Sequence, residues 1–398
     1  IHLQFAHWET GKTGQVLAAI CQRFSELLPR VMIDVTRRSF AEHFASLRRE
    51  ASSGKGPDVF LGSSAYLPDL IRTGLCLDLA PAMAREPVDL NAYWTSPGTN
   101  PTDGHQYAVP LWNTIDLVVY NRDHLAASHL AEPADSWTWD DLLAMAQKLT
   151  LGKPGEIRRW GLLLINDIQG GWGSFVASNG GDWVDVTRRT VVLDEAASLS
   201  ALRWCVEAIQ VHHVAPAPSV QQRLTAAGQL DPFLAGAVSL FPCGTWELPR
   251  ILDGATFRWD VCRIPRAPAT GRGTTISDVQ PVSAARTTRF PDQCWEFLRF
   301  ALGREAQLML ARDKTRLPAR RDAADDRTSG YTAPPPSRTG AVVSSADQAR
   351  DLGFLPGWLA MRRAIVRALD PAFDGQAPIE DAVRAAVVDG NAALAAAT

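Results

Sequence analysis

The chain has 398 residues, of which 46% are hydrophobic, and its formal net charge at pH 7 is −3. This length is too great for one ordinary hydrophobic core and predicts two lobes. A nucleic-acid binder would need a dominant basic face, and a membrane span would need about 18 consecutive apolar residues. Neither feature is present in the sequence.

The N-terminal part of the chain alternates between strand and helix patterns. Residues 1–5 and 31–35 alternate apolar with polar side chains, and residues 16–28 place apolar side chains on one helical face. After a second helical pattern, residues 58–61 form a short apolar strand that ends at Gly62-Ser63-Ser64. This order predicts a parallel sheet covered by helices, with ligands at the carboxyl ends of its strands.

A second α/β region follows. Its expected strands are 117–121, 160–164, 233–240 (which begins with a helix end) and 259–264. Residues 136–141 are expected to open a helix, and 199–209 and 295–302 to form two others. Thr138 and Asp141 have the spacing of a capping box. The Pro-, Ser- and Thr-rich segment 325–345 predicts an exposed, mobile loop.

The six cysteines are scattered and form neither zinc-binding pairs nor a redox motif. Buried free thiols are favoured, with one or two disulfides still open for an exported protein. We expect no metal and no cofactor. The thirteen tryptophans are more informative, because flat aromatic side chains stack on the apolar faces of sugar rings.

Enzyme motifs are incomplete. Gly11-Lys12-Thr13 has Ala6 where a phosphate-binding loop needs glycine, and Gly62-Ser63-Ser64-Ala65-Tyr66 does not fit the nucleophile pattern G-x-S-x-G. A pair of carboxylates for glycoside hydrolysis stays open, because their spacing depends on the fold. The sequence favours a protein that is not an enzyme.

Several short motifs, in this order, give the chain a family resemblance. They are Asp58-Val59-Phe60, Tyr107-Ala108-Val109-Pro110, Val119-Tyr120-Asn121, Trp137-Thr138-Trp139-Asp140-Asp141-Leu142, Ser178-Asn179-Gly180-Gly181-Asp182-Trp183, Gly244-Thr245-Trp246, Cys294-Trp295-Glu296-Phe297-Leu298-Arg299-Phe300 and Arg316-Leu317-Pro318-Ala319-Arg320. Over nearly its whole length the chain resembles the extracellular solute-binding proteins of ABC importers, family 1, which includes the maltose- and trehalose-binding proteins.

The resemblance implies a type II-like periplasmic-binding-protein fold, in which each lobe is a mostly parallel sheet flanked by helices and the lobes are joined by hinge crossovers. It places the N-terminal lobe at 1–110 plus 261–310 and the C-terminal lobe at 111–260 plus 311–398, with a ligand cleft between them. Closure over a small carbohydrate would deliver it to the membrane permease subunits. We expect an exported monomer at the cell surface or in the periplasm, lipid-anchored through a segment preceding residue 1, with no nucleic-acid partner.

Ten residues are the candidate ligand contacts. They are Trp8, Glu9, Ser63, Trp112, Asn113, Asp116, Trp172, Trp246, Asp278 and Arg316. The tryptophans would stack on sugar rings, Trp246 foremost because relatives carry an aromatic residue there. The carboxylates would accept hydrogen bonds from hydroxyls. Helix capping, turn formation or a surface ion pair would explain several of them equally well.

Other ligand classes stay open beside a neutral sugar. The carboxylates Glu9, Asp116 and Asp278 would suit an amino sugar, while Arg250 and Arg316 would suit a glycerophosphodiester. A quaternary ammonium would need a box of aromatic rings. A glycoside-acting enzyme is the minor alternative.

Overall fold

A computed structural model describes residues 1–53, 56–96, 99, 104–224, 231–312, 316–325 and 336–397. The chain divides into two compact units. Unit 1 comprises Ile1–Thr114, Asp278–Thr332 and Leu352–Pro356; unit 2 comprises Ile115–Ser277, Ala333–Asp351 and Gly357–Thr398. The predicted lobes had other bounds: the segment 261–277 lies in unit 2, and 311–332 lies in unit 1.

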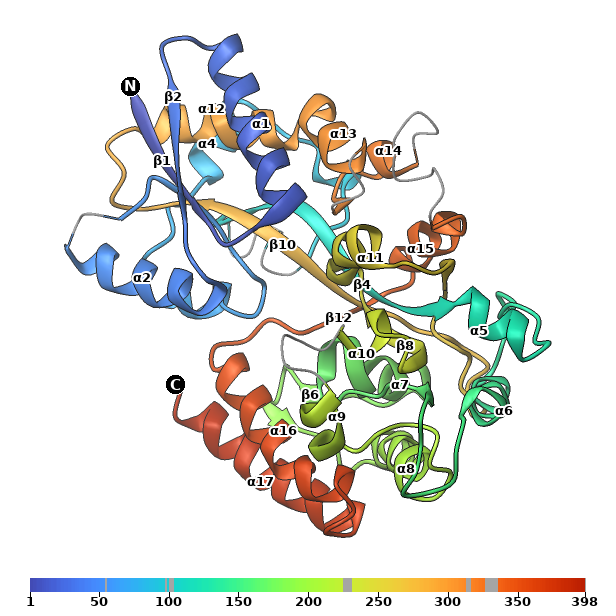
Figure 1. Cartoon of the computed structure of the whole chain (residues 1–398). Coiled ribbons are helices and arrows are strands. Elements are labelled where there is room, and N and C mark those ends of the chain that lie inside the picture. Colours follow the sequence, from blue (N-terminus) through green and yellow to red (C-terminus); the bar gives the residue numbers. More distant parts are fainter. Residues whose placement is uncertain are drawn as a thin grey trace. The chain divides into compact units, whose positions relative to one another are not determined.

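Unit 1 contains a parallel three-stranded arrangement with helices packed on it (Figure 1). Its elements are β1 (His2–His7), α1 (Gly11–Leu27), β2 (Met32–Arg37), α2 (Phe40–Ser53), β3 (Val59–Leu61), α3 (Leu67–Arg72), α4 (Ala80–Arg85), η1 (Leu90–Ala92), α12 (Pro291–Leu302), α13 (Arg304–Arg312), β11 (Leu317–Pro318) and α14 (Arg321–Ala324). The order is β2-β1-β3, and β10 (Ile276–Ala284) adds antiparallel to β3. The core joins the buried side chains of β1 to the apolar faces of α1 and α12.

Unit 2 is built around β8, which pairs antiparallel with β4 and parallel with β5. Its elements are α5 (Arg122–Ala127), α6 (Trp139–Leu149), β5 (Trp160–Leu162), η3 (Ile168–Trp172), α7 (Gly173–Ser178), β6 (Val184–Asp185), β7 (Thr190–Val191), α8 (Ala196–Gln210), α9 (Pro218–Leu224), α10 (Asp231–Leu234), β8 (Val238–Gly244), η4 (Thr245–Glu247), α11 (Leu248–Gly254), β9 (Trp259–Cys262), α15 (Thr339–Ala346), β12 (Arg350–Asp351), α16 (Trp358–Phe373) and α17 (Ile379–Ala395). The strand β4 (Val109–Asn121), like β10, begins in one unit and ends in the other.

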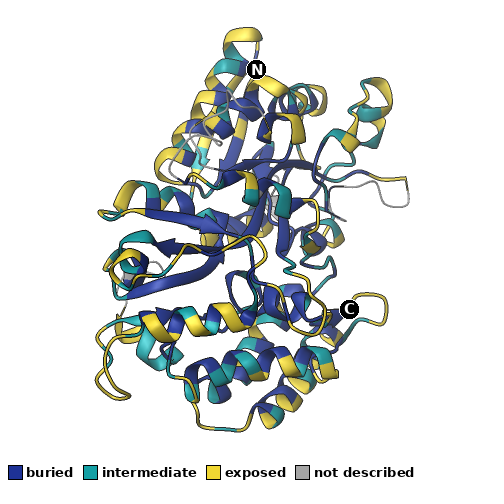
Figure 2. Ribbon diagram, turned by 90° about the vertical axis from the view of Figure 1, so that its right-hand side faces the viewer, coloured by how far each residue is buried: buried dark blue, intermediate teal, exposed yellow. Residues whose placement is uncertain are grey.

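Local sequence explains many of these elements. Thr138 and Asp141 form the predicted capping box at the start of α6. The helices carry exposed residues on one side and buried residues on the other, while the central strands are buried (Figure 2). All six cysteines are buried free thiols, as the sequence favoured. No helix in the described ranges combines the length and apolar character needed to cross a bilayer.

The predicted loop over 325–345 was partly wrong. Thr339–Ala346 form helix α15, which packs against β9 and buries Val343 and Ala346. Residues 326–335 of that prediction lie outside the described residues. Polar composition indicated a loop, but burial of a few small apolar side chains stabilises the helix in its tertiary setting.

Candidate ligand-binding residues

Trp8 and Glu9 directly follow β1, as the sequence predicted, but they have different surroundings. The Trp8 ring is partly buried and makes edge-on contacts with Phe40 and His43, with centroid distances of 5.0 and 5.2 Å. Glu9 is buried, and its Oε2 accepts a hydrogen bond from the Arg316 guanidinium at 2.6 Å. Trp8 therefore keeps part of its surface accessible, whereas the Glu9 carboxylate is held by a cation.

Arg316 contacts two other predicted residues of unit 1, Glu9 and Trp112. The antiparallel pairing of β11 with β4 sets Leu317 opposite Asn113, which brings Arg316 beside the buried Trp112. The guanidinium carbon lies 5.7 Å from the centroid of the Trp112 ring, a cation–π contact. The ion pair with Glu9 leaves less than a tenth of either side chain exposed. Glu9, Trp112 and Arg316 thus form one buried charged cluster.

The remaining predicted residues of unit 1 are polar groups on buried strands or strand ends. Asp278 was expected in a loop but lies inside β10, because the strand begins at Ile276. Its carboxylate accepts hydrogen bonds from Ser64 Oγ and, at 2.5 Å, from Gln280 Nε2. Ser63 is buried after β3, and its carbonyl accepts from the backbone of Tyr66 at the start of α3. Asn113 is fully buried within β4.

Asp116 is the predicted carboxylate of unit 2. Its Oδ2 accepts hydrogen bonds from the backbone N–H of Gly170 at 3.0 Å and from Ser174 Oγ at 2.9 Å. Its Oδ1 has no hydrogen-bond partner among the described residues. Burial raises the pKa of Asp116 to about 7, an effect that the two hydrogen bonds oppose and the charge of Asp167 reinforces.

Strand pairing brings Trp246 close to Asp116, and two glycines leave room for its ring. Register places Asp116 opposite Gly244, the last residue of β8. A Cβ on Gly244 would fall 1.7 Å from the Trp246 ring, and one on Gly170 would fall 3.2 Å from it. Gly244 therefore leaves the space that the ring occupies, and at Gly170 the tight contact and a positive φ of 72° both favour glycine. The ring is partly exposed, and its Nε1 donates to Glu247 Oε1 at 3.0 Å.

Trp172 differs from the expectation that its glycine-rich loop exposes the ring. Its side chain is 1% exposed, and its Nε1 donates to Asn166 Oδ1 at 3.0 Å. A Cβ on Gly171 would lie 2.3 Å from the Ile165 carbonyl oxygen. The expected exposure was wrong because the glycines allow close backbone packing, which buries the ring.

Sequence reasoning missed two groups near this site in unit 2. Asp167 and Arg362 form a bidentate ion pair with distances of 2.6 and 2.7 Å, and Ser174 supports Asp116. The ion pair joins residues 195 positions apart, and no local sequence pattern predicts such a contact. The signal for Ser174 was its place directly after the glycine-rich turn, at the start of α7.

The chain belongs to a known family. A family described as bacterial extracellular solute-binding proteins matches residues 19–336. This chain is a bacterial extracellular solute-binding protein. The family resemblance predicted from the sequence is thereby confirmed, and the chain is assigned to a class of exported solute-binding proteins.

Solved structures show the same fold at low sequence identity. An ABC substrate-binding protein from Listeria monocytogenes in complex with cycloalternan matches with a TM-score of 0.87 at 19% identity, covering 99% of both chains. The cyclic α-maltosyl-1,6-maltose binding protein of Arthrobacter globiformis matches with a TM-score of 0.82 at 20% identity, also covering 99% of both. The maltose/maltodextrin-binding domain MalE from Bdellovibrio bacteriovorus, bound to maltotriose, gives 0.78 at 16% identity and covers 98% of both. The predicted two-lobed α/β fold of periplasmic binding proteins is confirmed.

No group of three or more metal-binding side chains of His, Cys, Asp or Glu occurs among the described residues. The candidate ligand contacts consist of aromatic rings and hydrogen-bonding groups. These are the groups with which proteins bind neutral polar ligands.

Proposed function

We propose that this protein is the substrate-binding component of an ABC importer and that it captures a small neutral carbohydrate, most simply an oligosaccharide. The observation that carries the proposal is the partly exposed Trp246 ring, laid on two glycines and adjacent to the buried Asp116 carboxylate. An aromatic face next to a hydrogen-bonding carboxylate suits a sugar ring, which has an apolar face and a polar edge. Three structurally similar proteins were solved with, or are named for, oligosaccharides.

In this proposal each unit supplies one stacking tryptophan, Trp8 from unit 1 and Trp246 from unit 2. Both rings are partly accessible, whereas Trp112 and Trp172 are buried and support their neighbours. Asn113, Ser63 and Asp278 of unit 1, and Asp116 of unit 2, are the proposed hydrogen-bonding contacts. Binding to both units would stabilise a closed form that membrane permease subunits recognise.

Two of the three candidate carboxylates, Glu9 and Asp116, favour a neutral sugar over an amino sugar. The Glu9 carboxylate is already paired with Arg316, and burial raises the pKa of Asp116 to about 7. Below pH 7, therefore, neither group presents a free negative charge that would compensate an ammonium group. We further propose a monomer that is lipid-anchored outside the cell, which mass spectrometry and sizing of the natural protein would test.

The experiment is isothermal titration with maltotriose, a cyclic α-glucan, a β-linked disaccharide and an amino disaccharide. We expect at least one neutral oligosaccharide to bind, and Trp246→Ala to weaken its affinity about 10- to 100-fold, because one aromatic contact contributes about 1.5–3 kcal/mol. The matched control is Trp160→Ala, which removes a partly buried tryptophan of β5 outside the candidate site.

Two results would contradict the proposal. If Trp246→Ala and Trp160→Ala bind equally well, the stacking role of Trp246 is wrong while sugar binding stands. If no carbohydrate binds and none raises the melting temperature, the ligand class itself is wrong, since a ligand specific to the folded state must stabilise it. Preference for the amino disaccharide would reject the neutral class.

A further inference from the structure

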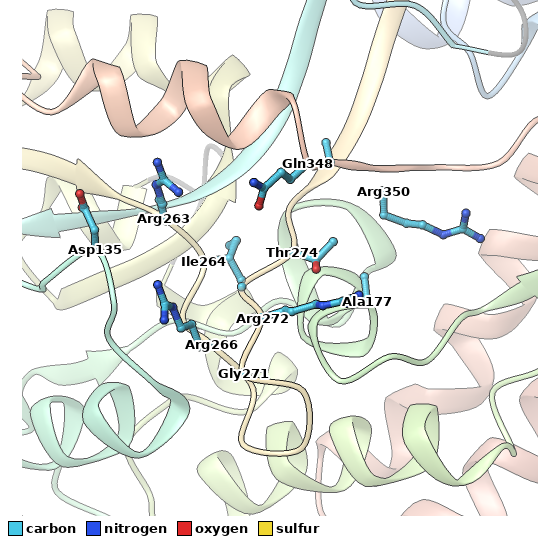
Figure 3. Close-up of a pocket in the computed structure, with 12 residues that line it drawn as sticks. Asp135, Ala177, Arg263, Ile264, Arg266, Gly271, Arg272, Thr274, Gln348 and Arg350 are labelled. Atoms are coloured by element: carbon cyan, nitrogen blue, oxygen red, sulfur yellow. The ribbon is translucent and has the colours of Figure 1, made fainter.

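An arginine-lined cavity lies within unit 2 and contains none of the proposed sugar contacts. Its volume is about 650 Å³, and its charged lining residues are Arg263, Arg266, Arg272, Arg350 and Asp135. Figure 3 shows these side chains arriving from separate segments, with Gln348 of the segment after α15 and Thr274 facing the same opening. We call this cavity the arginine pocket.

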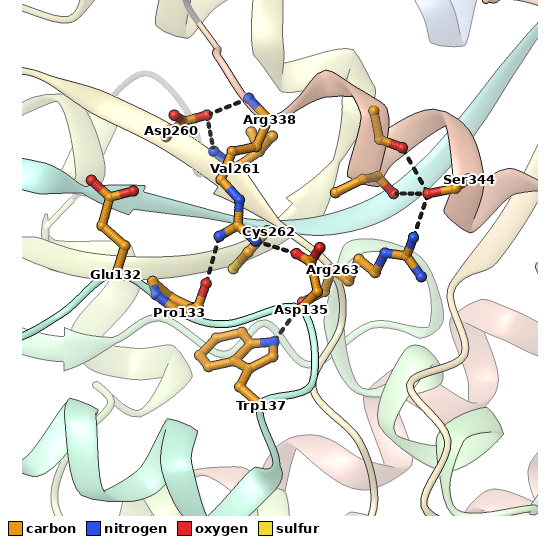
Figure 4. A network of polar contacts seen from close by, with 12 residues as sticks. Glu132, Pro133, Asp135, Trp137, Asp260, Val261, Cys262, Arg263, Arg338 and Ser344 are labelled. Atoms are coloured by element: carbon orange, nitrogen blue, oxygen red, sulfur yellow. Dashed lines mark hydrogen bonds and ion pairs between the residues drawn. The ribbon is translucent and has the colours of Figure 1, made fainter.

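The arginine pocket carries an excess of positive charge. Asp135, its lining carboxylate, is ion-paired with Arg338, as Figure 4 shows. Arg350 is paired with Asp182. Arg263 donates to the neutral Ser344 hydroxyl, and neither it nor Arg266 nor Arg272 forms an ion pair with any residue that the structure describes. Three guanidinium groups therefore line one cavity without a carboxylate partner there.

Two of these arginines stand on a backbone fixed by hydrogen bonds. Arg266 is clamped on both sides, because its N–H donates to the Trp137 carbonyl at 2.9 Å and its carbonyl accepts from Trp139 at 3.1 Å. The Arg272 carbonyl accepts from the backbone of Ala267 at 2.9 Å, which closes the loop between them. The pocket wall is thus held in place before any ligand arrives.

The end of the same loop is fixed to helix α7. The Thr274 N–H donates to Ser178 Oγ at 2.8 Å, and the Thr270 hydroxyl donates to the Ser178 carbonyl at 2.5 Å. Gly273 is required there, since a Cβ would lie 2.2 Å from the Ile264 carbonyl oxygen. Glycine at position 273 therefore allows the loop to pack closely against the Ile264 carbonyl. The Thr274 side chain lines the pocket.

We propose that the arginine pocket is a second binding site, for a small molecule that carries a phosphate group. Guanidinium groups bind phosphate oxygens through paired, charge-assisted hydrogen bonds, and clustered like charges are relieved by a bound polyanion. The Thr274 hydroxyl and the Gln348 amide add neutral donors. The volume is typical of a ligand pocket and leaves room for more than one phosphate group.

The test is titration of the protein with pyrophosphate by calorimetry. The ionic strength is held constant, so that electrostatic screening is the same at every point of the titration. We expect saturable binding in the wild type and an affinity at least about tenfold lower in the double variant Arg266→Gln/Arg272→Gln. The control is Arg363→Gln/Arg367→Gln, which removes two exposed charges from α16 and should bind pyrophosphate as the wild type does.

The proposal is overturned if pyrophosphate does not saturate the wild type, or if both double variants bind it equally. Because Arg266 and Arg272 have exposed side chains, their replacement should leave folding intact, and the melting temperature checks this. If the double variant does not fold, Arg272→Gln alone is the test and must also lower the affinity. Sugar affinity should not change in any of these variants, so failure here is distinguishable from failure of the proposed function.

Discussion

Two buried carboxylates among the candidate ligand contacts, Glu9 in unit 1 and Asp116 in unit 2, show how partners change the role of the same chemical group. Glu9 is held by a guanidinium at 2.6 Å that also lies over an indole ring. Asp116 is held by a backbone N–H and a hydroxyl, and burial raises its pKa to about 7. The first carboxylate is matched by a buried cation, whereas the second is held only by neutral donors.

Buried and partly buried histidines contrast with the buried Asp116 in their titration, and one of these histidines, His124, lies in unit 2 with its pKa lowered to about 4 by burial. Burial lowers the pKa of His7 and of His43, both in unit 1, to about 4, whereas in unit 2 burial raises the pKa of Asp116. Both kinds of shift favour the neutral form, as low polarity requires. The contribution of Asp116 to stability is therefore expected to depend on pH with the opposite sign to that of the histidines.

The largest effect is expected from a substitution that disrupts the buried charged cluster of Glu9, Trp112 and Arg316 in unit 1. Arg316→Ala leaves Glu9 buried beside no cation and should lower the free energy of unfolding by about 3–5 kcal/mol, as when one partner of a buried pair is removed. Urea unfolding followed by circular dichroism measures it. The control is Arg188→Ala, which removes an exposed ion pair with Asp185 and should cost at most about 1 kcal/mol. Equal losses in the two variants would show that burial does not distinguish the Glu9 pair.

The next prediction concerns Asp116→Asn. From the ordinary pKa near 3.8 up to about 7, the folded state keeps a proton that the unfolded state has lost, so stability falls as pH rises through this window. A difference of this size corresponds to about 4 kcal/mol. The asparagine cannot ionise but leaves its amide poorly satisfied, which costs about 1–3 kcal/mol. We expect the variant to be about 1–3 kcal/mol more stable than the wild type at pH 8.

Urea unfolding of both proteins at pH 5 and pH 8 checks this prediction. At pH 5 Asp116 is protonated in the folded protein, so the wild type should no longer be less stable than Asp116→Asn. Stability curves that run parallel from pH 5 to pH 8 would mean that Asp116 does not titrate in this range.

A smaller effect of opposite sign is expected in unit 1. His43 is neutral when folded, and its Nε2 contacts the Leu61 carbonyl oxygen at 2.8 Å. Its stability contribution is present above about pH 6.5 and is lost as pH falls towards 4. The effect of the lowered pKa reaches about 2 kcal/mol at pH 5. His43→Gln should remove this acid sensitivity, while the exposed control His212→Gln should retain it. Unchanged acid sensitivity in His43→Gln would contradict the prediction.

The smallest effect distinguishes the two candidate tryptophans of unit 2, Trp172 and Trp246. Trp172→Phe removes the hydrogen bond to Asn166 and should cost about 1 kcal/mol of stability. Because the ring is buried, sugar affinity should change much less than in Trp246→Ala. Thermal unfolding and titration of the sugar measure the two quantities. A loss of affinity equal to that of Trp246→Ala would place Trp172 in contact with the ligand.

Local patterns in the sequence predicted most elements and several candidate positions. Residues close together in the sequence determine several features. These are the strand and helix at residues 2–27, the capping box at Thr138 and the turn that carries Trp246. Apolar periodicity and caps act over a few residues, so they survive in a single sequence. The order of the motifs also identified the family.

Only the tertiary structure decided which groups meet. Glu9 and Arg316 are 307 positions apart, and strand pairing brings Arg316 beside Trp112. Close backbone packing buries Trp172, while two glycines 74 positions apart allow Trp246 to remain partly exposed. The sequence by itself determined most of the elements and the family, but not helix α15 or the start of β10. Burial and charge pairing depend on neighbours contributed by distant segments, and therefore only the folded chain determined which carboxylates and rings remain accessible.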